Sequence, residues 1–244
     1  MVATVSDQLE TSQRPTASTT HARTDIVPGV AGSDVVRSVL CFGDSNTYGY
    51  LASTDGRLGR WERWTGVAQR ALGVDDWYLI EDGLGGRTTS FEFPGTIGRN
   101  GRMSLLASLE LHEPLDALVI FLGTNDICLP GVTAAWAAAG VESLIEAVRT
   151  RPGPDPRPNI PILVVAPPPF LPLDATSEEL SPWALAESER FSEAYGAMSH
   201  RVGVELLDLR GVAAPTELDG IHFEQDAHRA IGMAVAEALR SLLQ

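Results

Sequence analysis

The sequence predicts one α/β domain in which helices cover both faces of a parallel β-sheet. Three observations predict this fold class. Short apolar runs rich in β-branched residues recur along the chain without polar alternation, which is typical of strands buried on both faces. Amphipathic helical patterns separate these runs. The 244 residues suffice for one large α/β domain.

The order of these segments predicts the architecture. Strands are expected at 35–42, 77–80, 117–122, 162–166 and 204–209. Helices are expected at 61–72, 103–112, 133–149, 182–201 and 225–243. Five parallel strands with helices between them give a three-layer α/β/α sandwich with right-handed crossovers.

Residues 1–34 differ from the rest of the chain. They are rich in Ser, Thr, Ala and Asp and lack apolar periodicity, which predicts a disordered or loosely packed extension, or an arm on a neighbouring subunit. Residues 35–244 show no repeat and no second apolar core, so they form one domain. The prolines of 151–161 should end a helix, and the Pro-rich loop 167–182 should cover the crevice at the strand ends.

The composition excludes several classes of function. The net charge is −14, with 32 acids against 18 bases, which argues against nucleic acid or an anionic membrane as a partner. No apolar stretch approaches the roughly 20 residues that cross a bilayer. Without a signal-peptide pattern, a cytoplasmic location is the default expectation. Cys41 and Cys128 are too few for a disulfide framework and are expected to be small buried residues.

Four polar segments fall in predicted loops, three of them directly after predicted strands and the fourth just before the last helix. The C-terminal ends of parallel strands share one edge of a sheet. The segments are 43–47 (GDSNT), 82–89 (DGLGGRTT), 123–126 (GTND) and 219–222 (DGIH). Each alone fits an ordinary turn or helix cap. Together they provide what acyl transfer by a serine needs: a nucleophile (Ser45), a base (His222), an acid that orients the base (Asp219) and oxyanion donors.

The Gly-x-Ser-x-Gly elbow of the α/β-hydrolases is absent, because Thr47 stands two residues after Ser45. Instead, "GDSNTYGY", "GLGGRTT", "GTND" and "DGIHF" resemble the four signature blocks of the SGNH (GDSL-type) hydrolase superfamily. With "EDGLGGRTT" and "VVAPPP", the chain looks most similar to its arylesterase/acyltransferase (perhydrolase-like) branch. The family fold is a flavodoxin-like α/β/α sandwich with a five-stranded parallel sheet. Asn46 departs from the family, which has leucine there, and this leaves the substrate open.

The resemblance implies a role for each site residue. Ser45 is the nucleophile, His222 the general base and Asp219 its partner. The oxyanion hole is expected from the amides of Ser45 and Gly86 and the side chain of Asn125, with Gly85 as the alternative glycine. Residues beside these motifs are expected to bind substrate: Asp44, Asn46, Tyr48, Tyr50, Ile127 and Ile221.

The expected function is a serine esterase for short-chain acyl (aryl or alkyl) esters that works through an acyl-enzyme. Its acceptors would be water, an alcohol or peroxide, with Tyr48, Tyr50 and the 167–183 loop drying the pocket. One alternative is a carbohydrate O-acetylesterase, in which Trp61, Trp64 and Trp183 would stack on sugar rings. For Trp61 and Trp64, however, a place in the core is the better explanation. Another is a non-catalytic binding module, which intact catalytic positions disfavour. The branch contains oligomers, so a homo-oligomer is one expectation.

No cofactor or metal is expected. Asp44 and Asp126 could suggest a metal site with Asp82, but no histidine or carboxylate spacing supports one. Asp44 and Asp126 are instead expected to fix loops by accepting hydrogen bonds from backbone amides. The histidines without an acid partner at a strand end are expected to be structural or superficial: His21, His112, His200 and His228.

Overall fold

A computed structural model describes residues 36–151, 160–173 and 180–244. Its main sheet contains β1 (Arg37–Gly43), β4 (Trp77–Gly83), β5 (Ala117–Phe121), β6 (Ile162–Ala166) and β7 (Glu205–Asp208). All neighbours pair in parallel, in the order β4-β1-β5-β6-β7. The predicted five-stranded parallel sheet is therefore confirmed. The predicted extension 1–34, which includes His21, lies outside the described residues.

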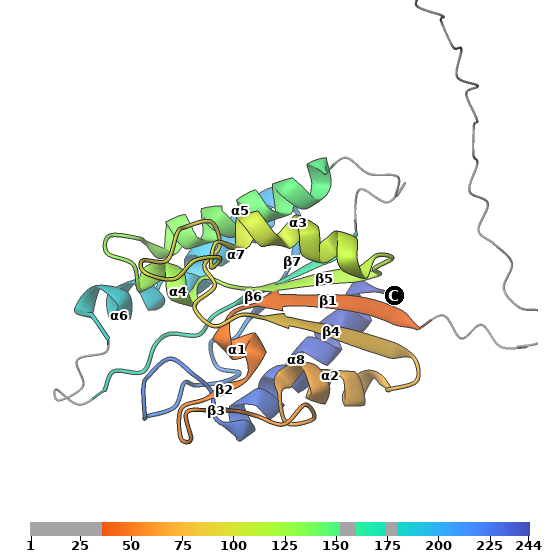
Figure 1. Cartoon of the computed structure of the whole chain (residues 1–244), viewed down its shortest axis with the longest axis horizontal. Helices are drawn as coiled ribbons and strands as arrows, with labels where there is room; N and C mark the ends of the chain where they lie inside the picture. The colour runs from red at the N-terminus through yellow and green to blue at the C-terminus, as the bar shows by residue number, and fades with distance from the viewer. Residues whose placement is uncertain (1–35, 152–159, 174–179) are drawn as a thin grey trace, which may run out of the picture. The chain divides into compact units, whose positions relative to one another are not determined.

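Helices cover both faces of this sheet. Figure 1 shows α3 (Gly101–His112), α5 (Ala134–Thr150) and α7 (Phe191–Val202) on one face. The helices α2 (Trp64–Leu72) and α8 (Gln225–Leu242) lie on the other, as a three-layer sandwich requires. A short hairpin of β2 (Tyr50–Leu51) and β3 (Gly56–Arg57) follows the first helix. The remaining helices of the described residues are α1 (Ser45–Tyr48), α4 (Thr124–Ile127) and α6 (Pro182–Ser188).

The central strand β1 shows why the chain forms three layers. Leu40 and Phe42 pack into the cluster beneath α3, α5 and α7, whereas Val39 and Cys41 pack into the cluster beneath α2 and α8. All four side chains are fully buried. Burial of a large aliphatic or aromatic side chain contributes about 1.5–3 kcal/mol, so both layers of helices are held by the same uninterrupted apolar run.

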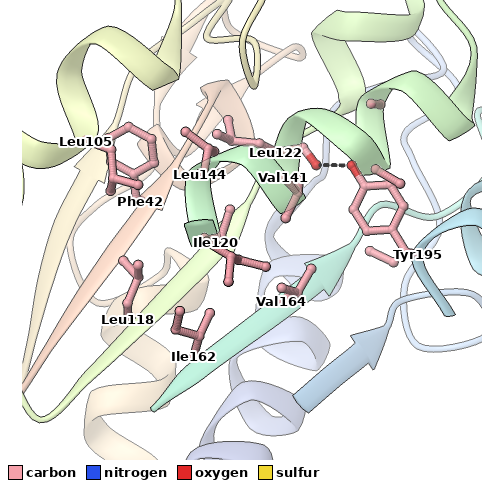
Figure 2. Close-up of a cluster of buried hydrophobic side chains, with 14 of the residues drawn as sticks. Phe42, Leu105, Leu118, Ile120, Leu122, Val141, Leu144, Ile162, Val164 and Tyr195 are labelled. Atoms are coloured by element: carbon pink, nitrogen blue, oxygen red, sulfur yellow. Dashed lines mark hydrogen bonds between the residues drawn. The ribbon is translucent and has the colours of Figure 1, made fainter. Parts of the chain in front are cut away.

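The first cluster also fixes the end of β5, where one of the polar motifs begins. Figure 2 shows Tyr195 of α7 among apolar side chains, with its hydroxyl on the carbonyl of Leu122. The hydroxyl donates this hydrogen bond over 2.7 Å. Burial raises the pKa of Tyr195 well above its usual value, so the hydroxyl remains a protonated donor.

The predicted helix 182–201 is wrong, because the structure has two helices there. α6 ends at Ser188 and α7 begins at Phe191. The buried carboxylate of Glu187 accepts a hydrogen bond from the amide of Ala134, one of the donors left unpaired at the start of α5. This tertiary contact fixes α6 against α5, whereas the local sequence pattern is continuous across 189–190.

Three smaller expectations also need correction. The helix expected from residue 61 begins at Trp64, because Glu62 instead closes a turn by accepting from the amide of Gly59. Trp64 is fully buried as expected, but Trp61 is 38% exposed. Cys41 is buried as expected, whereas Cys128 is exposed at the end of α4. Within the described ranges, no helix combines the length and the apolar character needed to cross a membrane.

Candidate active site

The polar motifs meet at one edge of the sheet. The motifs of Ser45, Gly86 and Asn125 follow β1, β4 and β5, and the 219–222 loop lies between β7 and α8. β1 lies between β4 and β5, so the loop of Ser45 is flanked by the loops of Gly86 and Asn125. This is the edge at which open parallel sheets bind their ligands.

Ser45 is the first residue of α1. Asp44 caps this helix through a hydrogen bond of 2.9 Å from the amide of Asn46 to its carboxylate. As the first helical residue, Ser45 has an amide that no helical carbonyl accepts. Its side chain is nearly enclosed, since Ser45 is only 8% exposed.

The Ser45 hydroxyl and two residues of the 219–222 loop form a chain of hydrogen bonds. Nε2 of His222 lies 2.8 Å from Oγ of Ser45, and Nδ1 lies 2.7 Å from Oδ2 of Asp219. The other oxygen of Asp219 accepts the amides of Ile221 and His222, each over 2.9 Å. Burial alone would raise the pKa of Asp219, but these hydrogen bonds outweigh it and leave the pKa below its usual value.

The backbone of the 219–222 loop is held from two sides. The amide of Leu171, after β6, donates to the carbonyl of Gly220 over 2.9 Å, and the amide of Thr216 donates to the carbonyl of His222 over 2.7 Å. Gly220 has φ +73°, and a Cβ there would lie 2.3 Å from the carbonyl oxygen of Leu171. Only glycine fits this close approach. The described part of the Pro-rich loop therefore contacts the 219–222 loop at Gly220.

The loops of the other two expected oxyanion donors, Gly86 and Asn125, flank the loop of Ser45. The amide of Arg87 donates to the carbonyl of Leu84, which forms a turn with Gly86 at φ +74°. The amide of Gly86 is not part of that turn hydrogen bond, and none of the described residues accepts it. Nδ2 of Asn125 donates to the carbonyl of Arg87 over 3.0 Å and lies 3.4 Å from Oδ2 of Asp44. The second contact is long, so this N–H can be redirected to a ligand.

Arg87 belongs to the 82–89 segment, and no role was predicted for it from the sequence. Its buried guanidinium donates to the carbonyls of Gly43 and Asp82 over 2.8 and 2.5 Å, and it pairs with the carboxylate of Asp82 at 2.8 Å. It also lies 4.0 Å from the centre of the Phe42 ring. Arg87 thereby ties the ends of β1 and β4 together and positions the carbonyl that orients Asn125. The buried position of its charge left no pattern in the sequence.

Two buried acids support the serine and Asn125. Asp126 accepts the amide of Thr89 over 3.1 and 3.0 Å and its hydroxyl over 2.5 Å, which joins the loops after β4 and β5. The expectation that Asp44 and Asp126 fix loops through backbone amides is confirmed. Burial raises the pKa of Asp44 to about 6 and that of Asp126 to about 7.

The six expected substrate-binding residues fall into two groups. Asp44, Asn46 and Ile127 are at most 1% exposed, so their side chains present no surface to a ligand here. The others are accessible. Tyr48 lies beneath the guanidinium of Arg57 at 4.1 Å, Tyr50 packs on His222 with ring centroids 4.5 Å apart, and Ile221 is half-buried.

Among the described residues, the remaining histidines form no hydrogen bond with Ser45, His222 or Asp219. His228 is buried, accepts the amide of Trp64 at Nδ1 and has its pKa lowered to about 4 by burial, so its structural role is confirmed. His112 and His200 are exposed. In the part of the chain that the structure describes, no group of three or more histidine, cysteine or acidic side chains is arranged to hold a metal ion.

The geometry has a defined chemical capability. A hydroxyl, an imidazole and a carboxylate in series can move a proton from the hydroxyl to the imidazole as the hydroxyl oxygen attacks a carbonyl carbon. The strand order places the loops of Gly86 and Asn125 on either side of the loop of Ser45.

Comparisons with known proteins agree with this arrangement. The profile of the GDSL-like lipase/acylhydrolase family matches residues 41–230. An aryl esterase from M. smegmatis is 35% identical over 85% of this chain and 100% of its own, with a TM-score of 0.78. A carbohydrate acetylesterase family member from Sinorhizobium meliloti is 33% identical over 85% of this chain and 99% of its own, with a TM-score of 0.80.

A second carbohydrate acetylesterase from Sinorhizobium meliloti is 34% identical over 84% of this chain and 99% of its own, with a TM-score of 0.78. No curated protein sequence matches the chain. The family profile spans most of the 36–244 region, and the similar structures share its fold from end to end. The resemblance seen in the four sequence motifs is thereby confirmed, and the chain belongs to the GDSL-like lipase/acylhydrolase family as a carboxylic ester hydrolase of the SGNH type.

Proposed function

We propose that this chain is a serine esterase that hydrolyses short-chain acyl esters of aryl or alkyl alcohols through an acyl-enzyme. The observation that carries the proposal is the series Ser45–His222–Asp219, with heavy-atom distances of 2.8 and 2.7 Å. Both distances lie within the 2.6–3.2 Å over which a nucleophile and its base exchange a proton.

The proposed reaction has two halves. Oγ of Ser45 attacks the ester carbonyl carbon while Nε2 of His222 takes the hydroxyl proton, and the carbonyl π electrons move to the oxygen. The amides of Ser45 and Gly86 and Nδ2 of Asn125 stabilise this oxyanion. When the tetrahedral species collapses, the bond to the leaving oxygen breaks and His222 returns the proton to the alcohol. Asp219 stabilises the imidazolium throughout.

In the second half, an acceptor attacks the acyl-Ser45 carbonyl and His222 takes the acceptor's proton. The tetrahedral species then collapses, the bond to Oγ of Ser45 breaks, and His222 returns the proton to Oγ. Water yields the acid, an alcohol yields a new ester and peroxide yields a peracid. Transfer to an alcohol is supported by the enclosed position of Ser45 and by the aromatic ring of Tyr50 on His222, because both reduce the room for water. The ratio of ester to acid formed with an added alcohol measures this part of the proposal.

The first test is kinetic. Initial rates on p-nitrophenyl acetate, butyrate and octanoate are measured for the wild type and Ser45→Ala side by side. We expect a rate that falls with chain length and is lost in Ser45→Ala, together with a transient acetyl mass shift in the wild type only. An acetyl adduct that persists on Ser45→Ala would show that another residue is the nucleophile.

A second substrate class, acetylated carbohydrate, is supported by one feature. Trp183 is 43% exposed, and its indole nitrogen donates to the carbonyl of Val132, shortly after the helix that carries Asn125. A fixed, exposed indole is a surface on which a sugar can stack. If acetylated oligosaccharide is turned over faster than p-nitrophenyl acetate, and Trp183→Ala removes that preference, the sugar ester is the better substrate.

A further inference from the structure

We propose that Tyr50 is a positioning residue for His222, and that its hydrogen bond to Asp55 is what holds it there. This inference rests on the proposed function, since it assigns a helper to the proposed general base. It replaces the expectation that Tyr50 is a substrate contact.

The first observation is the contact between the two rings. The centroids of Tyr50 and His222 lie 4.5 Å apart, with an angle of 59° between the ring planes. Both ring nitrogens of the imidazole are already paired, with Ser45 and Asp219. The tyrosine ring adds an apolar contact that limits rotation of the imidazole away from its hydrogen bonds with Ser45 and Asp219. It also offers an aromatic ring within the roughly 6 Å at which a ring attracts the cation that forms during the reaction.

The second observation is the partner of the Tyr50 hydroxyl. This hydroxyl donates to Oδ1 of Asp55 over 3.0 Å, at the exposed end of the side chain. Asp55 has φ +49°, and within the described ranges it is the only residue other than glycine with a positive φ. A residue held in an uncommon backbone conformation, whose side chain makes a specific contact, suggests that the contact has a function. Here the left-handed turn brings the carboxylate back to the strand that carries Tyr50.

The third observation is how the hairpin is attached. Tyr50 pairs with Arg57, and the guanidinium of Arg57 donates to the carbonyl of Tyr48 over 2.8 Å. At the turn, the hydroxyl of Ser53 donates to Glu224 over 3.1 Å, two residues after His222. The β2–β3 hairpin therefore joins the segment after Ser45 to the segment after His222, and Tyr50 projects from it onto the imidazole.

The alternative role, a wall of the acyl pocket, predicts different kinetics. A pocket wall changes KM and the preference among acyl chains. A residue that positions the base lowers kcat by a similar factor for every ester, because misplacement of the imidazole slows each proton transfer.

The test uses four variants of the full-length chain. Tyr50→Leu removes the ring, and Tyr50→Phe keeps the ring without its hydroxyl. Asp55→Gly removes the acceptor and keeps the left-handed backbone, whereas Asp55→Asn keeps both an acceptor and tolerance of that backbone. The exposed tyrosine of β4, changed as Tyr78→Phe, is the matched control for loss of a phenol hydroxyl.

We expect Tyr50→Leu to lower kcat about tenfold on acetate and butyrate alike, with KM little changed. Tyr50→Phe and Asp55→Gly should each lower kcat about threefold, and the double variant should be no worse than either, because both remove the same hydrogen bond. Asp55→Asn and Tyr78→Phe should retain the wild-type kcat.

A second readout separates this inference from the proposed function. A small alkyl fluorophosphonate labels an activated serine whatever its natural substrate, and intact mass reports the labelling rate. We expect Ser45 to be labelled, and more slowly in Tyr50→Leu. Labelling at the wild-type rate in Tyr50→Leu, or an effect that changes with acyl length, overturns the positioning role while the esterase stands. Absence of labelling in the wild type overturns the proposed function and this inference with it.

Discussion

The two halves of the candidate site are built in different ways. The serine half comprises Ser45, Asn125 and their supports Asp44, Arg87 and Asp126, and these supports are at most 4% exposed. The histidine half is the loop from Asp219 to His222, whose two polar side chains are 15% and 19% exposed. One half is anchored in the sheet by buried charges, and the other is a surface loop anchored by backbone contacts.

The difference shows in the acids of each half. Burial raises the pKa of Asp44 and Asp126, because the loss of solvation of their charge outweighs the hydrogen bonds that they accept. Asp219 keeps a lowered pKa because the His222 ring and two amides donate to it. The buried acids of the serine half therefore hold its loops but ionise less readily than ordinary carboxyls. The acid of the histidine half keeps the negative charge that the proposed imidazolium needs.

The largest effect is expected from breaking the serine half at Asn125. In Asn125→Ala the proposed side-chain donor to the oxyanion is lost, while the proposed backbone donors of Ser45 and Gly86 remain. We expect kcat to fall by about 10²–10³, the size found when one such donor is removed, with KM little changed. Steady-state kinetics on p-nitrophenyl acetate measures this effect. Full kcat in Asn125→Ala would show that Asn125 only orders the loop through Arg87.

The histidine half should be most sensitive to a change in the backbone of its loop. In Gly220→Ala the new Cβ would meet the carbonyl oxygen of Leu171 at 2.3 Å and the side chain of Leu180 at 2.7 Å, at φ +73°. The loop must shift, and His222 moves with it. We expect kcat to fall by about tenfold to a hundredfold, because a displacement of about 1 Å at a reacting group can have that effect.

Gly203→Ala is the matched control for this change. Gly203 follows α7 with φ +66°, and a Cβ there meets nothing within 4 Å. Both variants should lose about 1 kcal/mol of stability or more from the left-handed backbone. Only Gly220→Ala should lose kcat. Equal activity in the two variants would mean that the 219–222 loop absorbs the strain without moving His222.

The same contrast explains which parts could be predicted from the sequence. The strands could, because apolar runs such as 162–166 have no polar alternation, and this run matches β6 residue for residue. The convergence of Ser45, Asn125 and His222 followed from the rule that parallel strands end at one edge. What depends on tertiary contacts could not be predicted: the break between α6 and α7, set by Glu187, and the burial of Arg87.

The β2–β3 hairpin was missed for a related reason. Its strands contain two residues each, too few for an alternation pattern. The Asp55-Gly56 pair is a common hairpin-turn sequence and was the available signal. Without the hairpin, the only basis for predicting a role for Tyr50 was its place beside the serine motif. Its contact with His222 could not be predicted.

The smallest effect on rate and the clearest effect on stability should come from Asp126. Burial raises its folded-state pKa to about 7, above the roughly 3.9 of an unfolded chain. Between these values the folded state binds more protons than the unfolded state, so its contribution to the free energy of unfolding falls as the pH rises from about 4 to about 7. Asp44 acts in the same direction up to about pH 6. The lowered pKa of Asp219 gives a contribution that is present above the unfolded value and lost at lower pH.

Asp126→Asn should remove most of this pH dependence from the serine half. An amide oxygen in the place of Oδ1 can still accept the amide and the hydroxyl of Thr89, and the side chain carries no charge to desolvate. The free energy of unfolding of the variant, taken relative to that of the wild type, should rise by about 2–4 kcal/mol from pH 5 to pH 8. Urea denaturation at both pH values measures this change. The exposed acid Asp75, changed to Asn, controls for the loss of one negative charge. A wild-type difference between the two pH values that survives in Asp126→Asn would place its origin in Asp44 or elsewhere in the chain. A loss of stability at pH 8 would show that the hydrogen bonds from Thr89 need the full carboxylate charge, so that the serine half, like the histidine half, is held by an ionised acid.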